Sequence, residues 1–164
     1  MFNWRIIIVC DTKIYIFNMI NFQNVDTIDT FENQKGIIAV TYDPLINLIA
    51  YPDKAVGYVK LKNYDKNETI LMNAHDSKIA CLALSQDGDF LATASEKGTF
   101  VRIFRTANGV FLNEYRRGSE EAEIYSLEFD KNVRFVSCAA STGTIHIFSL
   151  ESTYKKLREA IKEQ

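Results

Sequence analysis

The chain has 164 residues, of which 47% are hydrophobic and 24% charged, as is ordinary for a globular protein. Nineteen Lys and Arg residues against 21 Asp and Glu give a net charge of −2, which argues against broad nucleic-acid binding and confines any anion site to a local cluster. The apolar runs at 6–9 and 37–40 are too short to span a membrane, and no signal-peptide pattern is present.

A repeated β unit dominates the sequence. The stretch "VCDTKIYIFNMINFQNVDTIDTF" predicts the last two strands of one unit, joined through "NMINFQN". Further units begin near Ile37, Ile79 and Ile124, so their starts are 42 and 45 residues apart. Each reads as a strand, a turn, a second strand, a turn containing Gly, and a third strand. A period of this length, with four strands per unit, is typical of a β-propeller blade.

The predicted fold is therefore all-β, with WD40-like four-stranded blades. We expect blades near 1–36, 37–78, 79–123 and 124–150, about three and a half of a seven-bladed ring, and a helical or loop tail at 151–164. In "TIHIF", Ile145 and Ile147 should share one face of the strand and His146 and Phe148 the other. An open set of blades leaves a sheet edge and half a core exposed, so we expect missing blades elsewhere in a longer protein, or pairing with another copy or chain.

The cysteines and the sequence motifs do not indicate an enzyme. Cys10, Cys81 and Cys138 form no C-x-x-C pair and lie in apolar segments, which predicts reduced core thiols in a cytosolic protein and no metal site. The sequence contains no P-loop, no G-x-S-x-G and no H-E-x-x-H motif. We therefore expect no catalytic residues and no cofactor.

Two adjacent cations stand out in "NEYRRGSEEAEIYSL". Successive side chains on a strand point to opposite faces, so Arg116 and Arg117 should reach into two neighbouring pockets rather than clamp one phosphate together. The planar guanidinium donates two parallel hydrogen bonds to a phosphate. Gly118 lets the backbone turn directly afterwards. The alternatives are that the pair is solvated surface, or that it forms salt bridges with Glu120, Glu121 or Glu123.

A family resemblance gives this pair a context. The segment "LATASEKGTFVRIFRTANGVFLNEYRRG", followed by "IYSLEF" and "STGTIHIF", closely resembles the PROPPIN family, the WD-repeat phosphoinositide-interacting proteins of autophagy. "NQKGIIAV" and "LIAYPDKAVGYVKL" also fit, so the resemblance covers nearly all of residues 5–150. Tyr115 replaces the usual Leu or Phe before the arginines, and an aromatic ring should keep the packing at a half-buried position. Generic WD-repeat blades carry Gly-His near the start and Trp-Asp at the end. Here only "AHDSKI" hints at Gly-His, and Trp4 is not followed by Asp.

The resemblance implies two phosphoinositide sites, one on each side of the arginine pair. The first is predicted to consist of His75, Ser95, Thr99, Arg102 and Arg116. The second is predicted to consist of Arg117, Ser137, Ser141, Thr142, Thr144 and His146. Two members have competing interpretations: His75 also fits the structural histidine of a WD blade, and the neighbours of Ser137 look buried.

The tail "ESTYKKLREAIKEQ" changes to helical spacing, with Tyr154, Leu157 and Ile161 on one face and basic residues around them. The resemblance implies that this segment starts a long loop that can insert into membrane, and a basic amphipathic stretch can lie on an anionic leaflet. The alternative is a solvated terminal helix that packs on the last blade.

The resemblance also implies a function. On this resemblance, the protein is expected to be a peripheral membrane scaffold in autophagy and endolysosomal traffic that recognises phosphatidylinositol 3-phosphate and 3,5-bisphosphate. Its expected partners are phosphoinositide membranes and autophagy proteins of the lipid-transfer or conjugation machinery, not nucleic acid. Its expected location is cytoplasmic, on preautophagosomal, endosomal or vacuolar membranes. A generic WD-repeat interaction scaffold without lipid specificity is the alternative.

Overall fold

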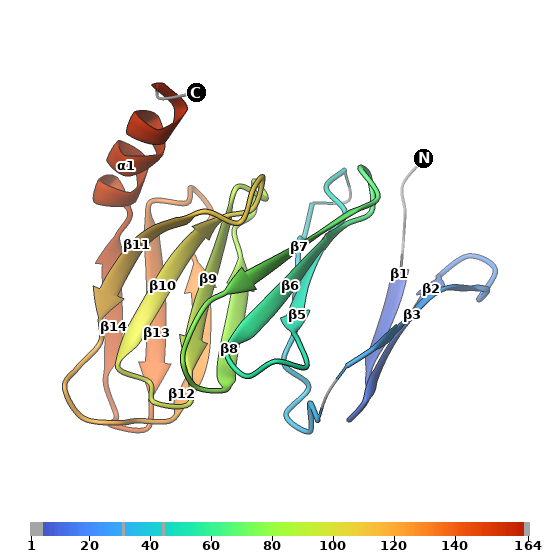
Figure 1. The fold of residues 1–164 in the computed structure, drawn as a ribbon, viewed down its shortest axis with the longest axis horizontal. Coiled ribbons are helices and arrows are strands. Elements are labelled where there is room, and N and C mark those ends of the chain that lie inside the picture. The colour runs from blue at the N-terminus through green and yellow to red at the C-terminus, as the bar shows by residue number, and fades with distance from the viewer. Residues whose placement is uncertain (1–4, 31, 44, 163–164) are drawn as a thin grey trace.

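The computed structural model describes residues 5–30, 32–43 and 45–162, which form four antiparallel sheets followed by a helix (Figure 1). The first two sheets contain β1 (Arg5–Val9), β2 (Lys13–Asn18) and β3 (Asn24–Asp29), then β4 (Ala39–Val40), β5 (Leu48–Pro52), β6 (Tyr58–Asn63) and β7 (Glu68–Asn73). The last two contain β8 (Ile79–Leu84), β9 (Phe90–Ser95), β10 (Phe100–Arg105) and β11 (Phe111–Arg116), then β12 (Ile124–Phe129), β13 (Phe135–Ala140) and β14 (Ile145–Ser149). Helix α1 (Glu151–Lys162) ends the described chain.

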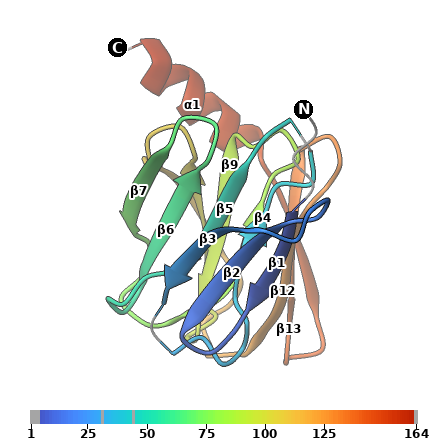
Figure 2. The same cartoon turned by 90° about the vertical axis from the view of Figure 1, so that its right-hand side faces the viewer.

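The sheets stack face to face in chain order, from β1–β3 at one end to β12–β14 at the other (Figures 1 and 2). Within each sheet the strands also follow chain order, so each unit is a simple meander. This arrangement confirms the predicted all-β fold of repeated blades. The first unit contains one strand more than the two predicted, because β1 pairs with β2 along its whole length.

Apolar clusters fill the space between neighbouring sheets, and β9 shows how one strand serves two of them. All six of its residues are buried. Leu91 packs into the cluster shared with β4–β7, whereas Phe90 and Ala92 pack into the cluster shared with β12–β14. This alternation follows from the two-residue period of a strand. The central sheets are thereby fixed on both faces.

The outermost faces of the stack are uncovered, as expected for an open set of blades. On β14, Ile145 and Ile147 are 72% and 68% exposed, while His146 and Phe148 on the opposite face are half-buried. The predicted alternation in this strand is confirmed. At the other end, Ile8 of β1 is also exposed.

The cysteines are free, but they are not all core residues. Cys138 is buried in β13, where burial raises the pKa of its thiol to about 11, and Cys81 is half-buried in β8. Cys10 is exposed, so the prediction of a core thiol was wrong at this position. It lies in the turn between β1 and β2, where its N–H donates to the carbonyl of Lys13, and the turn points the side chain to solvent.

Helix α1 lies against the third sheet. Thr153 is fully buried, and the ring of Tyr154 meets the ring of Phe90 edge-on with centroids 5.2 Å apart. Asn113 of β11 donates to Ser152 (2.8 Å) and accepts from Lys156 (2.9 Å). These contacts favour the interpretation of the tail as a helix packed on a blade. The side chain of Ile161 and the residue Trp4 lie outside the described part of the chain. Among the described residues, no helix is long and apolar enough to cross a membrane.

Candidate functional site

The arginine pair lies where β11 ends. Arg116 is the last residue of the strand and pairs with Phe100 of β10, and two positions earlier Glu114 pairs with Arg102. The N–H of Arg117 then donates to the carbonyl of Thr99 (2.8 Å), which turns the chain into the loop that leads to β12. Because directly opposed residues share a face, Arg116 lies on the face of Arg102, and Arg117 starts on the other.

Arg117 is a buried cation, only 7% exposed. Its Nε donates to the carbonyl of Gly98 (2.6 Å) and its Nη2 to the carbonyl of Glu120. Gly98 has a φ of +63°, and a Cβ there would lie 1.9 Å from the carbonyl oxygen of Ala122, so only glycine fits this approach. The guanidinium has five N–H donors, and the described contacts use two. It therefore holds the 117–123 loop through these two carbonyls.

The fourth sheet packs against the end of β11, next to Arg117. The ring of Tyr115 stacks on Phe148 of β14 with centroids 5.1 Å apart, and its hydroxyl donates to the carbonyl of Ser149 (2.8 Å). The half-buried packing expected for an aromatic residue here is thus present. Strands β11 and β14 run in opposite directions (Figure 1), and Arg117 and His146 each lie two residues from the stacked pair, on the side of it where β11 ends and β14 begins. The charge of Arg117 also acts on the Cys138 thiol, and Cys138 pairs with His146.

A short polar chain continues from His146 along the β13–β14 turn. Its Nε2 lies 3.1 Å from Oγ1 of Thr144, which in turn lies 2.9 Å from Oγ1 of Thr142. Both threonines are exposed, so their hydroxyls are accessible to a ligand at this edge. Three of the residues predicted for the second site are thereby linked to one another.

The two serines of that predicted set are placed elsewhere. Ser137 pairs with Ile147 on the outer face of the sheet, opposite to His146, and donates to the carbonyl of Glu128 (3.3 Å). Ser141 accepts the N–H of Glu123 (3.1 Å) and lines a recess rich in carboxylates. Neither hydroxyl has a described hydrogen bond to Arg117.

Arg116 and Arg102 form the cationic part of the first predicted site. Arg116 is exposed, and its described hydrogen bond, from Nε to the carbonyl of Gly118, is long at 3.5 Å. Arg102 is held more firmly, with Nε donating to Oε2 of Glu114 (2.6 Å) and Nη1 to the carbonyl of Ala74 (2.7 Å). Arg102 thereby connects the third sheet to the end of the second.

The remaining members of this set are largely buried. Nε2 of His75 lies 2.9 Å from Oγ1 of Thr93, which pairs with Arg102 in the sheet. Ser95, at the end of β9, is buried as well. Thr99 is half-buried, and its backbone contact is with Arg117 rather than Arg116. Burial, with a smaller effect of the Arg102 charge, lowers the pKa of His75 to about 4. A neutral, enclosed imidazole fits the structural interpretation of His75.

Lowering the pH from about 6.5 to 4 is expected to destabilise the chain through His75. In this range the unfolded chain binds a proton that the folded chain does not, because the folded-state pKa lies below the ordinary value of 6.5. The stabilisation is complete above pH 6.5 and falls by up to about 3 kcal/mol toward pH 4. Urea denaturation at several pH values measures it. His75→Gln should flatten this dependence, and an unchanged slope would contradict the assignment.

Of the two alternatives for the arginine pair, the structure speaks against the salt bridges, whereas the exposed side chain of Arg116 fits solvated surface. Within residues 5–30, 32–43 and 45–162, neither Arg116 nor Arg117 forms an ion pair. Arg117 contacts Glu120 through the backbone carbonyl, and Glu123 pairs with Lys35 at 3.2 Å instead.

Sequence reasoning missed two side chains of the site, Thr93 and Glu114. Both face Arg102 across the sheet. Strand alternation offered a signal for Glu114, since it stands two residues before Arg116 and must share its face. Its ion pair with Arg102 required the register of β10 against β11, which the sequence did not provide.

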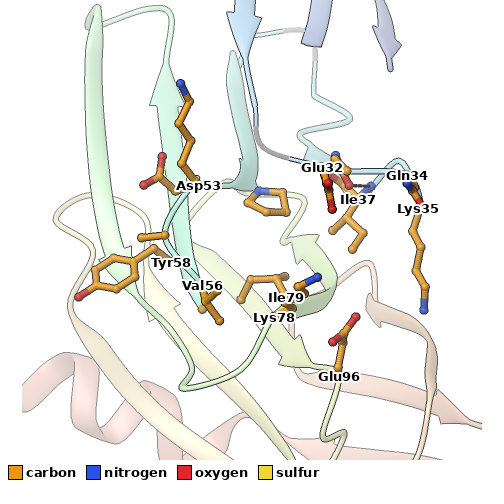
Figure 3. A pocket seen from close by; sticks show the side chains of 15 residues that line it. Glu32, Gln34, Lys35, Ile37, Asp53, Val56, Tyr58, Lys78, Ile79 and Glu96 are labelled. Atoms are coloured by element: carbon orange, nitrogen blue, oxygen red, sulfur yellow. Dashed lines mark hydrogen bonds between the residues drawn. The ribbon is translucent and has the colours of Figure 1, made fainter. Parts of the chain in front are cut away.

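A cavity of about 170 Å³ lies elsewhere, between the 32–37 segment, the β5–β6 turn and the start of β8. Figure 3 shows Ile37 and Ile79 toward its middle, with Lys35 and Glu96 on one flank and Asp53 on the other. None of the predicted site residues lines it. Its rim carries as many carboxylates as lysines, so it lacks the positive excess that a polyphosphate ligand needs.

Comparisons with known proteins show the family and the fold of this chain. A family model described as PROPPIN matches residues 1–161. Autophagy-related protein 18e of Arabidopsis thaliana is 38% identical over 146 residues, which cover 89% of this chain and 39% of that protein. The Hsv2 structure of Kluyveromyces lactis matches with a TM-score of 0.81 and 23% identity, over 94% of this chain and 48% of that chain. A complex of KlAtg21 with the coiled coil of AgAtg16 matches with a TM-score of 0.77 and 27% identity, over 90% of this chain and 50% of that chain.

The fraction of each relative that this chain covers shows how much of the propeller it contains. This chain spans about two fifths of the length of the curated relatives it matches and about half of the matched structures. The four described sheets therefore correspond to roughly half of the Hsv2 propeller, as the prediction of about three and a half blades required.

Proposed function

Since this chain belongs to the PROPPIN family, we propose that it is a non-enzymatic peripheral membrane scaffold that binds 3-phosphorylated phosphoinositides. One observation carries the proposal. Arg116 and Arg117 follow one another at the end of β11, yet the first lies on the face of Arg102 and the second lies against the sheet of His146. Each cation is free of carboxylate partners within the described residues.

The first proposed site uses Arg116 and Arg102, with the hydroxyl of Ser95 at the adjoining end of β9. Arg116 supplies the accessible charge, and Arg102 supplies a second guanidinium on the same face. A phosphate monoester offers several acceptor oxygens, and each charge-assisted hydrogen bond to them contributes roughly 1.5–3 kcal/mol.

The second proposed site uses Arg117 with Thr142, Thr144 and His146. The buried guanidinium is already oriented by two carbonyls, so little side-chain entropy is lost when an anion binds. The threonine hydroxyls and the imidazole supply neutral donors beside it. Two weak sites on one rigid edge would bind a membrane more tightly than either alone.

The cellular role follows from the family. We propose action in autophagy and endolysosomal traffic, at preautophagosomal, endosomal or vacuolar membranes, with recruitment of autophagy proteins. The relatives are named for autophagy, and the matched KlAtg21 structure holds the coiled coil of AgAtg16. An analogous coiled-coil protein is the partner we propose for the complete propeller.

Flotation with liposomes tests the proposal. The chain should float with vesicles that contain phosphatidylinositol 3-phosphate or 3,5-bisphosphate and should stay at the bottom with phosphatidylcholine alone or with phosphatidylinositol 4-phosphate. Equal behaviour with all four compositions would instead indicate a WD-repeat scaffold without lipid specificity. Dependence on salt should be strong, because the binding is ionic.

A further inference from the structure

We propose that Glu114 is a built-in competitor of the ligand: in the unliganded chain its carboxylate occupies Arg102, and thereby lowers the affinity of the first site for a phosphate monoester. This inference rests on the function proposed above. It concerns how tightly the first site binds, not whether the second one does.

The contact itself is the first ground. Nε of Arg102 donates to Oε2 of Glu114 at 2.6 Å, the short distance of a charge-assisted hydrogen bond. The two residues are directly opposed in the β10–β11 register, so the pair forms without any change in the backbone. The side chains are about one-third exposed or less, which shields their attraction from water better than at an open surface.

Position is the second ground. Glu114 lies on the same strand and the same face as Arg116, two residues away, which is roughly 7 Å along a β-strand. A phosphate that contacts both Arg116 and Arg102 must therefore lie next to the Glu114 carboxylate. Like charges at such a distance repel each other, so the carboxylate has to rotate away or weaken the complex.

The second site shows the contrast. Arg117 donates to two backbone carbonyls, and within the described residues no carboxylate side chain contacts its guanidinium. The two sites thus differ in this respect: an internal anion competes with the ligand at the first and not at the second. Removing the charge of Glu114 should strengthen the first site alone.

Glu114→Gln is the variant of choice, since glutamine keeps the size of the side chain and an oxygen acceptor for Arg102. Calorimetric titration with the soluble headgroup inositol 1,3-bisphosphate should show the first site binding roughly three- to tenfold tighter than in the wild type, the gain expected from releasing one partly exposed ion pair and its repulsion. Glu68→Gln, which removes one exposed charge from β7 without a described ion pair, is the matched control and should bind like the wild type.

Two further measurements identify the ligand and test whether Glu114 acts through Arg102. The gain should appear with vesicles containing phosphatidylinositol 3-phosphate and be much smaller with inorganic phosphate. A gain confined to inorganic phosphate would overturn the headgroup as the ligand. In an Arg102→Met background, Glu114→Gln should gain less than twofold, and a full gain there would contradict the role of Arg102.

The outcomes separate the two proposals. Tighter binding by Glu114→Gln, including binding where the wild type shows none, supports the competitor. Equal or weaker binding by Glu114→Gln, or the same gain in Glu68→Gln, overturns the competitor and leaves the proposed function standing. An absence of headgroup and vesicle binding in all variants overturns both.

Discussion

Replacing Arg116 and Arg117 together with threonine is expected to abolish flotation on vesicles that contain phosphatidylinositol 3-phosphate. Each guanidinium contributes charge-assisted hydrogen bonds of roughly 1.5–3 kcal/mol, and tenfold in affinity corresponds to about 1.4 kcal/mol. Loss of both should therefore weaken binding by more than about a hundredfold. The single replacements should each weaken binding less, because one site remains.

The folding of each variant must be measured together with its flotation, because Arg117 also stabilises the structure. Its replacement leaves the carbonyls of Gly98 and Glu120 without their donor, at a cost of about 1–3 kcal/mol in the free energy of unfolding. Arg117→Lys keeps a buried cation and serves as a milder second variant. Replacing the exposed Lys66 and Lys131 with threonine removes the same charge elsewhere and should leave flotation intact. Membrane binding that survives in the folded double-arginine variant would overturn the proposed sites.

Phe90→Ala is expected to lower the free energy of unfolding by about 3–5 kcal/mol, the range for truncating a fully buried phenylalanine. The ring lies between the third and fourth sheets and meets Tyr154 of α1 edge-on. Its loss should therefore also release the helix. Urea denaturation gives the free energy, and the rate of tryptic cleavage at Lys155 and Lys156 reports the release.

Phe135→Ala is the matched control for that variant. This phenylalanine belongs to β13 but is 40% exposed on the uncovered face, so its removal should cost less than about 1 kcal/mol and leave tryptic cleavage of α1 unchanged. Equal losses for the two variants, or a helix that stays protected when Phe90 is removed, would contradict the packing described for α1.

Much of the fold could be predicted from the sequence because its signals are local and repeated. The recurrence of units from Ile37, Ile79 and Ile124 identified the blades, and the alternation of Ile145 and His146 assigned the two faces of β14. Both signals depend on the two-residue period of a strand, which needs no knowledge of tertiary contacts. The opposite placement of the two arginines follows from the same period.

What could not be predicted depends on register and on packing between blades. The sequence does not say that Arg117 would be buried against two carbonyls, since this requires the turn at Gly98 to lie beside the 117–123 loop. The ion pair of Glu114 with Arg102 likewise depends on how β10 and β11 align. Ser137 was assigned to the second site by resemblance alone, whereas its position next to Cys138 places it on the opposite face.

The central claim is that neighbouring guanidinium groups serve two separate headgroups, one on each side of β11. The most direct measurement is the stoichiometry of inositol 1,3-bisphosphate binding by calorimetric titration of the wild type, Arg116→Thr and Arg117→Thr, each first shown to be folded. The expected result is about two headgroups per wild-type chain and about one for each variant. A single headgroup on the wild type, lost completely in both variants, would show that the arginines share one site and would contradict the account.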